Sequence, residues 1–225
     1  MKLELTIPTH LNEIKLLQYQ KFLKIAKENE DSEFLHQKMV QIFCGIELKE
    51  VANIKRKDVT SITNNLGSLF NKNHKFIERF KIGGTEFGFI PNLDDMTQGE
   101  YVDLDTYITN WDEMHKAMAV LFRPIINKMG DRYQIEDYQG SKSYSELMRH
   151  APLDVVLGAV VFFYHLGNEL LKSTLTYLEE NQTITDLVNK HNSENVGDGI
   201  TLSMLSLKET LEDLMKFQNL QFINV

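Results

Sequence analysis

The sequence predicts an α+β fold that is predominantly α-helical, a helical bundle with a small antiparallel sheet. Two observations lead to this prediction. Apolar residues recur at helical spacing along most of the 225-residue chain. Residues 75–91, KFIERFKIGGTEFGFIP, instead alternate on both sides of a Gly-Gly pair, which is typical of a two-residue hairpin. A chain of this length can bury a sizeable core without disulfide or metal crosslinks. Its single cysteine, Cys44, cannot form an intrachain disulfide.

A short strand and four helices are expected before the hairpin. Residues 2–7 alternate and stop at Pro8, which predicts a strand. Because an isolated hairpin is marginally stable, it needs a third strand, and residues 2–7 are the candidate. Thr9 and Asp58 are placed to cap helices, and Gly45 is placed to end one in the left-handed conformation. The four helices are expected over residues 11–29, 32–44, 48–54 and 59–72.

More helices and one more short strand are expected after the hairpin. Thr97 and Glu100 form the capping-box pattern T-x-x-E, which marks the start of a helix. The apolar face of this helix is expected to carry Tyr101, Leu104, Ile108 and Trp111. The next helix covers residues 111–125 and ends or kinks at Pro124. An alternating run within residues 129–140 suggests a strand. Further helices are expected over residues 143–150 and 152–178 and from residue 206.

This pattern divides the chain into two parts. Residues 1–180 are expected to form a mainly helical core domain that includes the sheet. Residues 181–225 are expected to form a loop, a C-terminal helix and an apolar tail. The most apolar run, residues 155–164, is far shorter than the roughly 20 residues that a bilayer requires, so no membrane span is expected. A net charge of -8 also disfavours general nucleic-acid binding, which depends on Lys and Arg.

The densest group of charged residues is acidic and lies in residues 89–108, FIPNLDDMTQGEYVDLDTYI. Its carboxylates are Asp94, Asp95, Glu100, Asp103 and Asp105. Carboxylates near a helix start are stabilised by the helix dipole, and helical spacing disperses these side chains instead of converging them on an ion. The sequence therefore favours a capped helix start. The alternative of another class is a metal-dependent hydrolase, which would use Asp94, Asp95, Glu100 and His115.

Other sequence signs of catalysis are absent. There is no glycine-rich phosphate loop, no nucleophile elbow and no H-E-x-x-H motif. His115 falls near an apolar stripe, where a hydrogen-bonded core histidine is expected. Cys44, in MVQIFCGI, is expected to be a small buried side chain rather than a nucleophile. The sequence thus predicts a non-enzymatic protein without a metal or other cofactor.

The charge is divided unevenly along the chain. Residues 47–81 carry eight basic and four acidic residues, whereas residues 91–112 carry six acidic residues and no basic one. Such a division can steer one subunit onto the next. The residues expected to make such contacts are Lys55, Arg56, Lys57, Asp94, Asp95, Asp103 and Asp105. In the apolar C-terminal tail, Phe222 and Ile223 are expected to pack against the chain's own body or a neighbouring subunit.

Three stretches resemble a protein family of tailed bacteriophages. The pattern F-x-F-I-P-N-hydrophobic-D-D is present at residues 87–95, T-x-G-E-Y-hydrophobic-D-L at residues 97–104, and M-H-K-A-M-A-V-L-[YF]-R-P-I at residues 114–125. The family is associated with morphogenesis in phages that infect Bacteroidetes, and the resemblance brings no catalytic residues. A looser similarity, over residues 37–59, is to phage tail-assembly chaperones.

The resemblance implies one of two roles. As a virion component of the portal, neck or tail region, the protein would form a homo-oligomeric ring and contact other phage structural proteins. As a soluble tail-assembly chaperone, it would hold aggregation-prone segments of a tail protein in the host cytoplasm and leave before maturation. Neither role requires a membrane or specific nucleic-acid binding.

Overall fold

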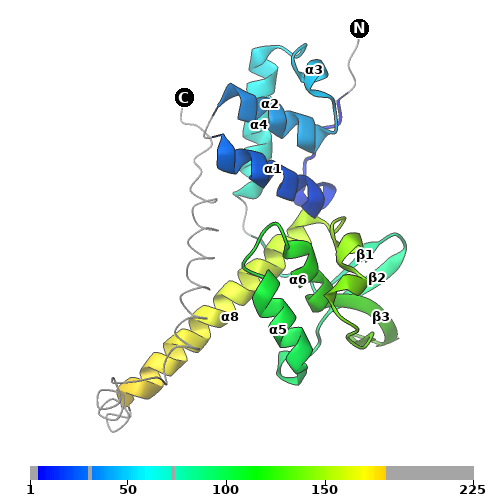
Figure 1. The fold of residues 1–225 in the computed structure, drawn as a ribbon, viewed down its shortest axis with the longest axis vertical. Helices are drawn as coiled ribbons and strands as arrows, with labels where there is room; N and C mark the ends of the chain where they lie inside the picture. Colours follow the sequence, from blue (N-terminus) through cyan, green and yellow to red (C-terminus); the bar gives the residue numbers. More distant parts are fainter. Residues whose placement is uncertain (1–4, 30–31, 72–73, 181–225) are drawn as a thin grey trace.

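The fold consists of a helical lobe, a sheet lobe and one long helix that begins between them and extends away from the helical lobe (Figure 1). The computed structural model describes residues 5–29, 32–71 and 74–180. Within these residues there are eight α-helices and one four-stranded antiparallel sheet, which confirms the predicted, mostly helical α+β class. The predicted C-terminal helix and the tail residues Phe222 and Ile223 lie outside the described part.

The N-terminal part of the chain forms the helical lobe. As predicted, Gly45 ends one helix with a φ of 68°, and Ser32 caps the other end of that helix through its side chain. The first predicted helix is interrupted, because Lys15 is extended, so Thr9 does not cap its long part. Asp58 lies in the first turn of its helix rather than at the cap. The helical elements of this lobe are the 3-10 helix η1 (Leu11–Glu13), α1 (Leu16–Glu28), α2 (Glu33–Cys44), α3 (Leu48–Val51) and α4 (Arg56–Phe70).

Aromatic side chains fill the core of the helical lobe. The ring centroid of Phe43 in α2 lies 5.3 Å from that of Phe22 in α1 and 5.5 Å from that of Phe70 in α4. Tyr19 of α1 contacts Trp111 of the other lobe edge-on, with centroids 5.2 Å apart. The aromatic core therefore continues from one lobe into the next.

The sheet has the order β1-β2-β3-β4, and all neighbouring strands are antiparallel. Gly83 and Gly84 form the β1–β2 turn with φ values of 57° and 87°, the positive angles that a two-residue turn requires. The predicted third strand over residues 2–7 is wrong in its described part, because residues 5–7 have no regular secondary structure and β3 lies beside β2. The strand expected within residues 129–140 is present as β4. The strands are β1 (Arg79–Ile82), β2 (Thr85–Phe89), β3 (Phe122–Met129) and β4 (Arg132–Ile135).

Strand β3 begins inside a segment that the sequence predicts to be helical. Helix α6 (Met114–Leu121) stops before residue 122, and Pro124 pairs with Phe87 of β2 instead of kinking a helix. Pro124 has no N–H to donate, but its carbonyl accepts from the Glu136 N–H at 2.9 Å. The run from α6 into β3 is buried almost continuously, and apolar periodicity does not separate a buried helix from a buried strand.

The two lobes are joined by backbone pairing just before α1 and just before α8. The Leu16 N–H donates to the Ala151 carbonyl at 3.0 Å, and the Leu153 N–H donates to the Ile14 carbonyl at 2.9 Å. The buried side chain of Gln20 donates to a backbone carbonyl of the loop before α6 at 2.7 Å. These contacts fix the helical lobe on the sheet lobe.

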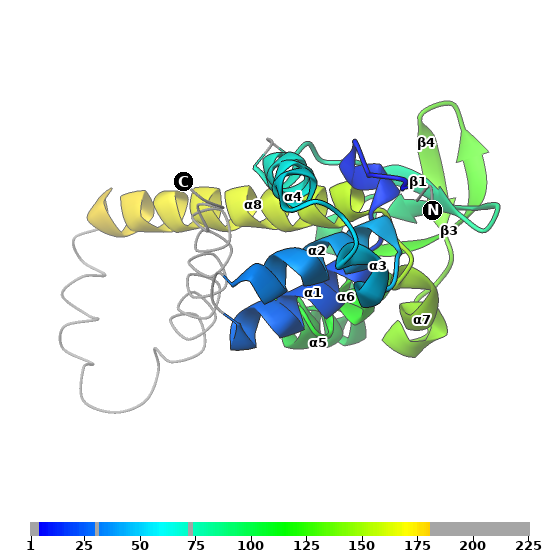
Figure 2. The same ribbon diagram turned by 90° about the horizontal axis from the view of Figure 1, so that it is seen from above.

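Helix α8 extends well beyond both lobes (Figures 1 and 2). Its 28 residues correspond to a length of roughly 42 Å. Its Gly158 lies so close to the chain before β1 that an added Cβ would be 2.3 Å from the Lys75 carbonyl oxygen. Among the described residues, no helix has both the length and the apolar character needed to cross a membrane. The remaining elements are η2 (Leu93–Asp95), α5 (Gln98–Tyr107), η3 (Ser141–Ser143), α7 (Ser145–Met148) and α8 (Leu153–Glu180).

Candidate functional site

The acidic segment is a capped helix start, as the sequence predicts. The Thr97 hydroxyl accepts from the Glu100 N–H at 3.3 Å, and the Glu100 carboxylate accepts from the Thr97 N–H at 2.7 Å. Asp94 and Asp95 are exposed in η2, and Asp105 is exposed on α5. All three carboxylates are accessible to a partner, although the Asp95 carboxylate accepts a hydrogen bond from Asn92 Nδ2 at 2.7 Å.

Glu100 is buried against Arg123 of β3. The sequence places Glu100 among the dispersed carboxylates of the helix start and does not indicate that it is buried. Only 5% of the Glu100 side chain and 8% of the Arg123 side chain are exposed, and Arg123 Nη1 donates to the carboxylate. Burial by itself raises the pKa of Glu100, but hydrogen bonds from Thr97 and Arg123 outweigh it and hold the pKa below its ordinary value. Tyr101, predicted on the apolar face, is 56% exposed instead. The helix is therefore rotated relative to the predicted apolar stripe.

Tyr138 connects this ion pair to Asp103. Its hydroxyl donates to the Asp103 carboxylate, and its ring lies against the Arg123 guanidinium, with the centroid 5.5 Å from Cζ. Burial and then the Asp103 carboxylate raise the pKa of Tyr138 above its ordinary value. Asp103, predicted as an interaction residue, is thus half-buried and already bonded within the chain.

Arg123 also lines a small cavity of about 90 Å³. Its Nε atom is buried and has no hydrogen-bond partner among the described residues, a situation that an ordered water usually resolves. Glu136, whose carboxylate accepts from the Tyr144 hydroxyl, and Asp137 line the same cavity. The cavity is therefore polar, and its carboxylates disfavour an added anion.

The residues of the metal-dependent alternative are not gathered in one place. The Glu100 carboxylate is held in the capping box and the ion pair, and His115 Nδ1 lies 3.3 Å from Gln20 Nε2. Within the described ranges, no group of three or more His, Cys, Asp or Glu side chains could hold a metal ion. Burial lowers the pKa of His115, which fits the predicted core histidine. Burial also raises the pKa of the half-buried Cys44 thiol to about 11.

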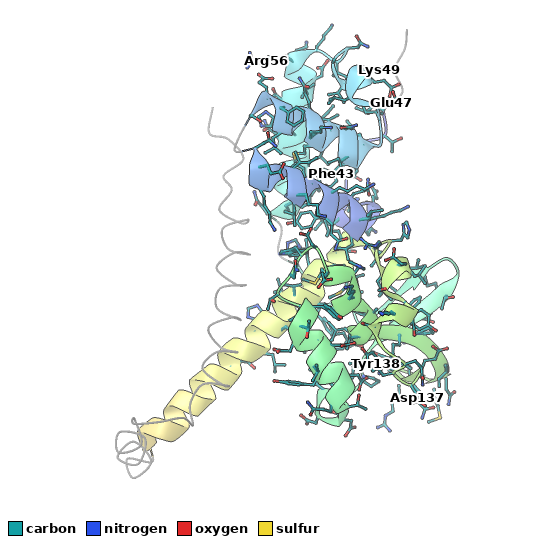
Figure 3. The ribbon with its side chains drawn as sticks, in the orientation of Figure 1. Phe43, Glu47, Lys49, Arg56, Asp137 and Tyr138 are labelled. Carbon is teal, nitrogen blue, oxygen red and sulfur yellow. The ribbon has the colours of Figure 1, made fainter. Side chains whose placement is uncertain are left out.

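The predicted basic contact residues, Lys55, Arg56 and Lys57, are all exposed at the start of α4. They lie at the opposite end of the body from α5 (Figures 1 and 3). Arg56 Nη2 is 2.5 Å from a carboxylate oxygen of Glu33 on α2, but these side chains are 85% and 62% exposed. Such an exposed pair contributes little to stability, so it can exchange for another partner.

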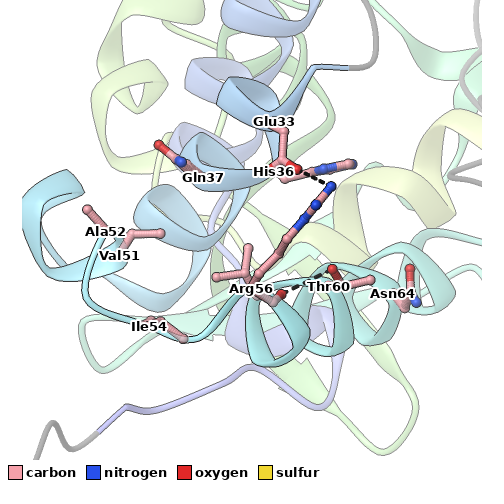
Figure 4. A pocket seen from close by; sticks show the side chains of 10 residues that line it. Glu33, His36, Gln37, Val51, Ala52, Ile54, Arg56, Thr60 and Asn64 are labelled. Carbon is pink, nitrogen blue, oxygen red and sulfur yellow. Dashed lines mark hydrogen bonds and ion pairs between the residues drawn. The ribbon is translucent and has the colours of Figure 1, made fainter.

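A groove of about 460 Å³ lies beside these basic residues, between α2 and α4 and bordered by α3 (Figure 4). Val51, Ile54 and Val59 supply its apolar part. The Arg56 side chain reaches from α4 toward Glu33 on α2 (Figure 4). The structure thus places a groove with an apolar part and a polar part beside an exposed basic segment at one end of the molecule.

The sequence does not identify Arg123 or Tyr138 as important residues. A signal exists for Arg123, because a lone basic residue in the apolar run AMAVLFRPII needs an acidic partner if it is buried. The partner is Glu100, 23 residues earlier in the chain. Only the packing of α5 on β3 selects Glu100 from the several nearby carboxylates.

No protein-family model, curated protein or solved structure matches this chain. The geometry of the described residues and the sequence resemblance to phage proteins are therefore the basis for a functional proposal.

Proposed function

We propose that the protein is a non-enzymatic bacteriophage protein, a virion component of the portal, neck or tail region that acts through contacts between subunits. The observation that carries this proposal is the separation of exposed charge. Lys55, Arg56 and Lys57 lie at the start of α4, at one end of the body, with the exposed Glu33 and Asp58 beside them. The exposed Asp94 and Asp95 lie in η2, directly before α5, which lies at the other end.

This arrangement favours head-to-tail association. The basic end of one copy is attracted to the acidic end of the next, and complementary charges orient the encounter. A head-to-tail interface uses two different surfaces of each subunit and closes into a ring when the rotation between copies permits. The proposed assembly is a homo-oligomeric ring that contacts other phage structural proteins in the virion, and the charge arrangement supports its head-to-tail contact.

The sequence resemblance supports the phage setting. The three matching patterns lie at residues 87–95, 97–104 and 114–125. In the fold, these residues form β2, η2, α5, α6 and the start of β3, so they are contiguous with the acidic end. The part of the chain that carries the resemblance is thus the part that presents one of the two charged surfaces.

The second candidate is a soluble tail-assembly chaperone. The groove between α2 and α4 supports this role, because its mixture of apolar and polar lining residues can hold an amphipathic segment of a client protein. Mass spectrometry of purified particles separates the two roles. A virion component is detected in mature particles at a fixed copy number, and a chaperone is absent from them.

Light scattering on a charge-reversal variant tests the proposed contact. The double variant Lys55→Glu/Lys57→Glu should lower the oligomeric mass, because both positions then repel the acidic end of the neighbour. Adding Asp94→Lys and Asp95→Lys should restore the mass by restoring opposite signs. Salt should weaken the original association, since exposed charges are screened beyond about 8 Å at physiological ionic strength.

The matched control is the double variant Lys21→Glu/Lys27→Glu. Both lysines are exposed on α1, which neither lines the groove nor carries the acidic segment. The control makes the same change in net charge and should leave the oligomeric mass unchanged. A monomer at every salt concentration, or an equal loss of mass in the control, would contradict the proposed interface.

A further inference from the structure

We infer that the groove between α2 and α4 is the docking site for the C-terminal segment of a neighbouring copy, residues 206–225. This inference rests on the proposed head-to-tail assembly and adds a second contact to it. The segment lies outside the described residues, so its sequence, its length and the position where the described chain ends provide the argument.

The groove has the features of a site for a helix. Val51 is buried, Ile54 and Val59 are half-buried, and all three face the same space of about 460 Å³. Thr60 and Asn64 continue the lining along α4, so the groove follows the helix axis (Figure 4). An amphipathic helix laid there would pack on α2 and α4 through apolar residues on one face.

The ion pair across the groove is easily opened. The Arg56 and Glu33 side chains are mostly exposed, and such exposed pairs contribute little to stability. A segment that carries its own carboxylates would replace Glu33 as the partner of Arg56. Breaking the Arg56–Glu33 pair would therefore cost little binding free energy.

The sequence of residues 206–225 fits this groove. Ser206 and Glu209 have the capping-box pattern, which predicts a helix. The apolar positions at helical spacing are Leu207, Leu211 and Leu214, and the acidic positions are Glu209, Glu212 and Asp213. Opposite them in the docked state are the groove's apolar residues and the exposed Lys55, Arg56 and Lys57. The apolar patterns match, and the carboxylates of the segment can pair with Lys55, Arg56 and Lys57. The segment also carries Lys208 and Lys216, which have the sign opposite to Glu33 in the groove.

In the proposed assembly the described chain ends near the groove of a neighbouring copy; the groove of the same copy is also within reach of residues 181–205, and the mass of the crosslinked product separates the two. Helix α8 ends at Glu180, away from the helical lobe that contains the groove and toward the end where α5 lies (Figure 1). In the proposed assembly, this acidic end faces the basic end of the neighbour, where the neighbour's groove lies. Residues 181–205 can span up to roughly 85 Å when extended, which is ample for this reach.

Site-specific photo-crosslinking of the full chain tests the inference. Benzoylphenylalanine replaces Asn64, which lines the groove, and in the matched control it replaces Asn65. Both residues are exposed on α4, but Asn65 does not line the groove. Crosslinked products are separated on a denaturing gel and mapped by mass spectrometry.

The expected product from position 64 is a band of twice the chain mass whose crosslink maps to residues 206–225, with a yield at least tenfold above that from position 65. The variant Leu211→Asp/Leu214→Asp should reduce this yield about tenfold. Equal yields from positions 64 and 65, a crosslink to another part of the chain, or a product of single-chain mass would overturn the inference.

Oligomeric mass, measured on the same samples, separates this inference from the proposed function. A charge-dependent oligomer that gives no crosslink to residues 206–225 overturns the docking site and leaves the head-to-tail proposal intact. A monomer at every salt concentration overturns both.

Discussion

Replacing Arg123 with methionine provides a direct test of the buried ion pair that holds α5 on the sheet. The Arg123 and Glu100 side chains are 8% and 5% exposed, so the substitution leaves a carboxylate buried without its counter-charge. Methionine retains much of the apolar stem of arginine, which separates the loss of charge from the loss of packing.

The expected cost is about 3–5 kcal/mol, the usual range when one partner of a buried pair is removed. With a urea m-value of about 3 kcal/mol/M, this cost lowers the unfolding midpoint by roughly 1–1.7 M. Unfolding can be followed by the fluorescence of Trp111, the only tryptophan in the chain, which is 7% exposed in the folded state. The double variant Glu100→Gln/Arg123→Met should cost less than the sum of the two single variants, because the unpaired charge is removed.

The matched control is Arg149→Met, which breaks the exposed pair with Glu146 at 2.9 Å. That pair is 31% and 77% exposed, so its loss should cost less than about 1 kcal/mol. A similar small cost for Arg123→Met, or additive costs in the double variant, would refute the assignment of Glu100 and Arg123 as a coupled buried pair.

Three further predictions follow from the same structure. Thr97→Ala should destabilise the protein by about 0.5–2 kcal/mol in urea unfolding through loss of the helix cap, and Thr97→Ser should not. Gly158→Ala should cost about 1–3 kcal/mol in the same assay, because its Cβ would lie 2.3 Å from the Lys75 carbonyl oxygen, whereas Gly99→Ala, with its nearest contact at 3.8 Å, should not introduce a clash. The pKa of Glu100 is lower in the folded than in the unfolded state, so this group's contribution to stability is present above its unfolded pKa, near 4.5, and is lost as the pH falls through the folded value. Unfolding measured between pH 6 and pH 3 should show a smaller loss in Glu100→Gln; an equal loss in both proteins would contradict the lowered pKa.

Local signals in the sequence predict local structure well. Gly45 ends its helix in the left-handed conformation, and Gly83 and Gly84 form the hairpin turn, because few other residues tolerate positive φ. The Thr97–Glu100 capping box is also present, since both of its hydrogen bonds connect residues three apart. Each of these features depends on a few consecutive residues.

Two local predictions, the helix caps at Thr9 and Asp58, are wrong, and the other incorrect predictions concern contacts between distant parts of the chain. The segment before Pro124 is apolar enough to be a buried helix or a buried strand, and pairing with β2 decides that β3 begins at Phe122. This pairing puts β3 beside β2, in the third-strand position that residues 2–7 were expected to fill. It also brings Arg123 beside Glu100, which makes Glu100 a core residue of α5 and leaves Tyr101 exposed.

The sequence by itself determines the mostly helical α+β class, the caps and turns, and the uneven division of charge, because each of these is written in spacing and composition. Only the tertiary structure decides which strand completes the sheet, which carboxylate is buried, and that the basic and acidic segments lie at opposite ends with a groove beside the basic one. The physical reason is that burial and strand pairing depend on which surfaces come into contact. Local sequence patterns do not specify which distant residues will be neighbours in the folded chain.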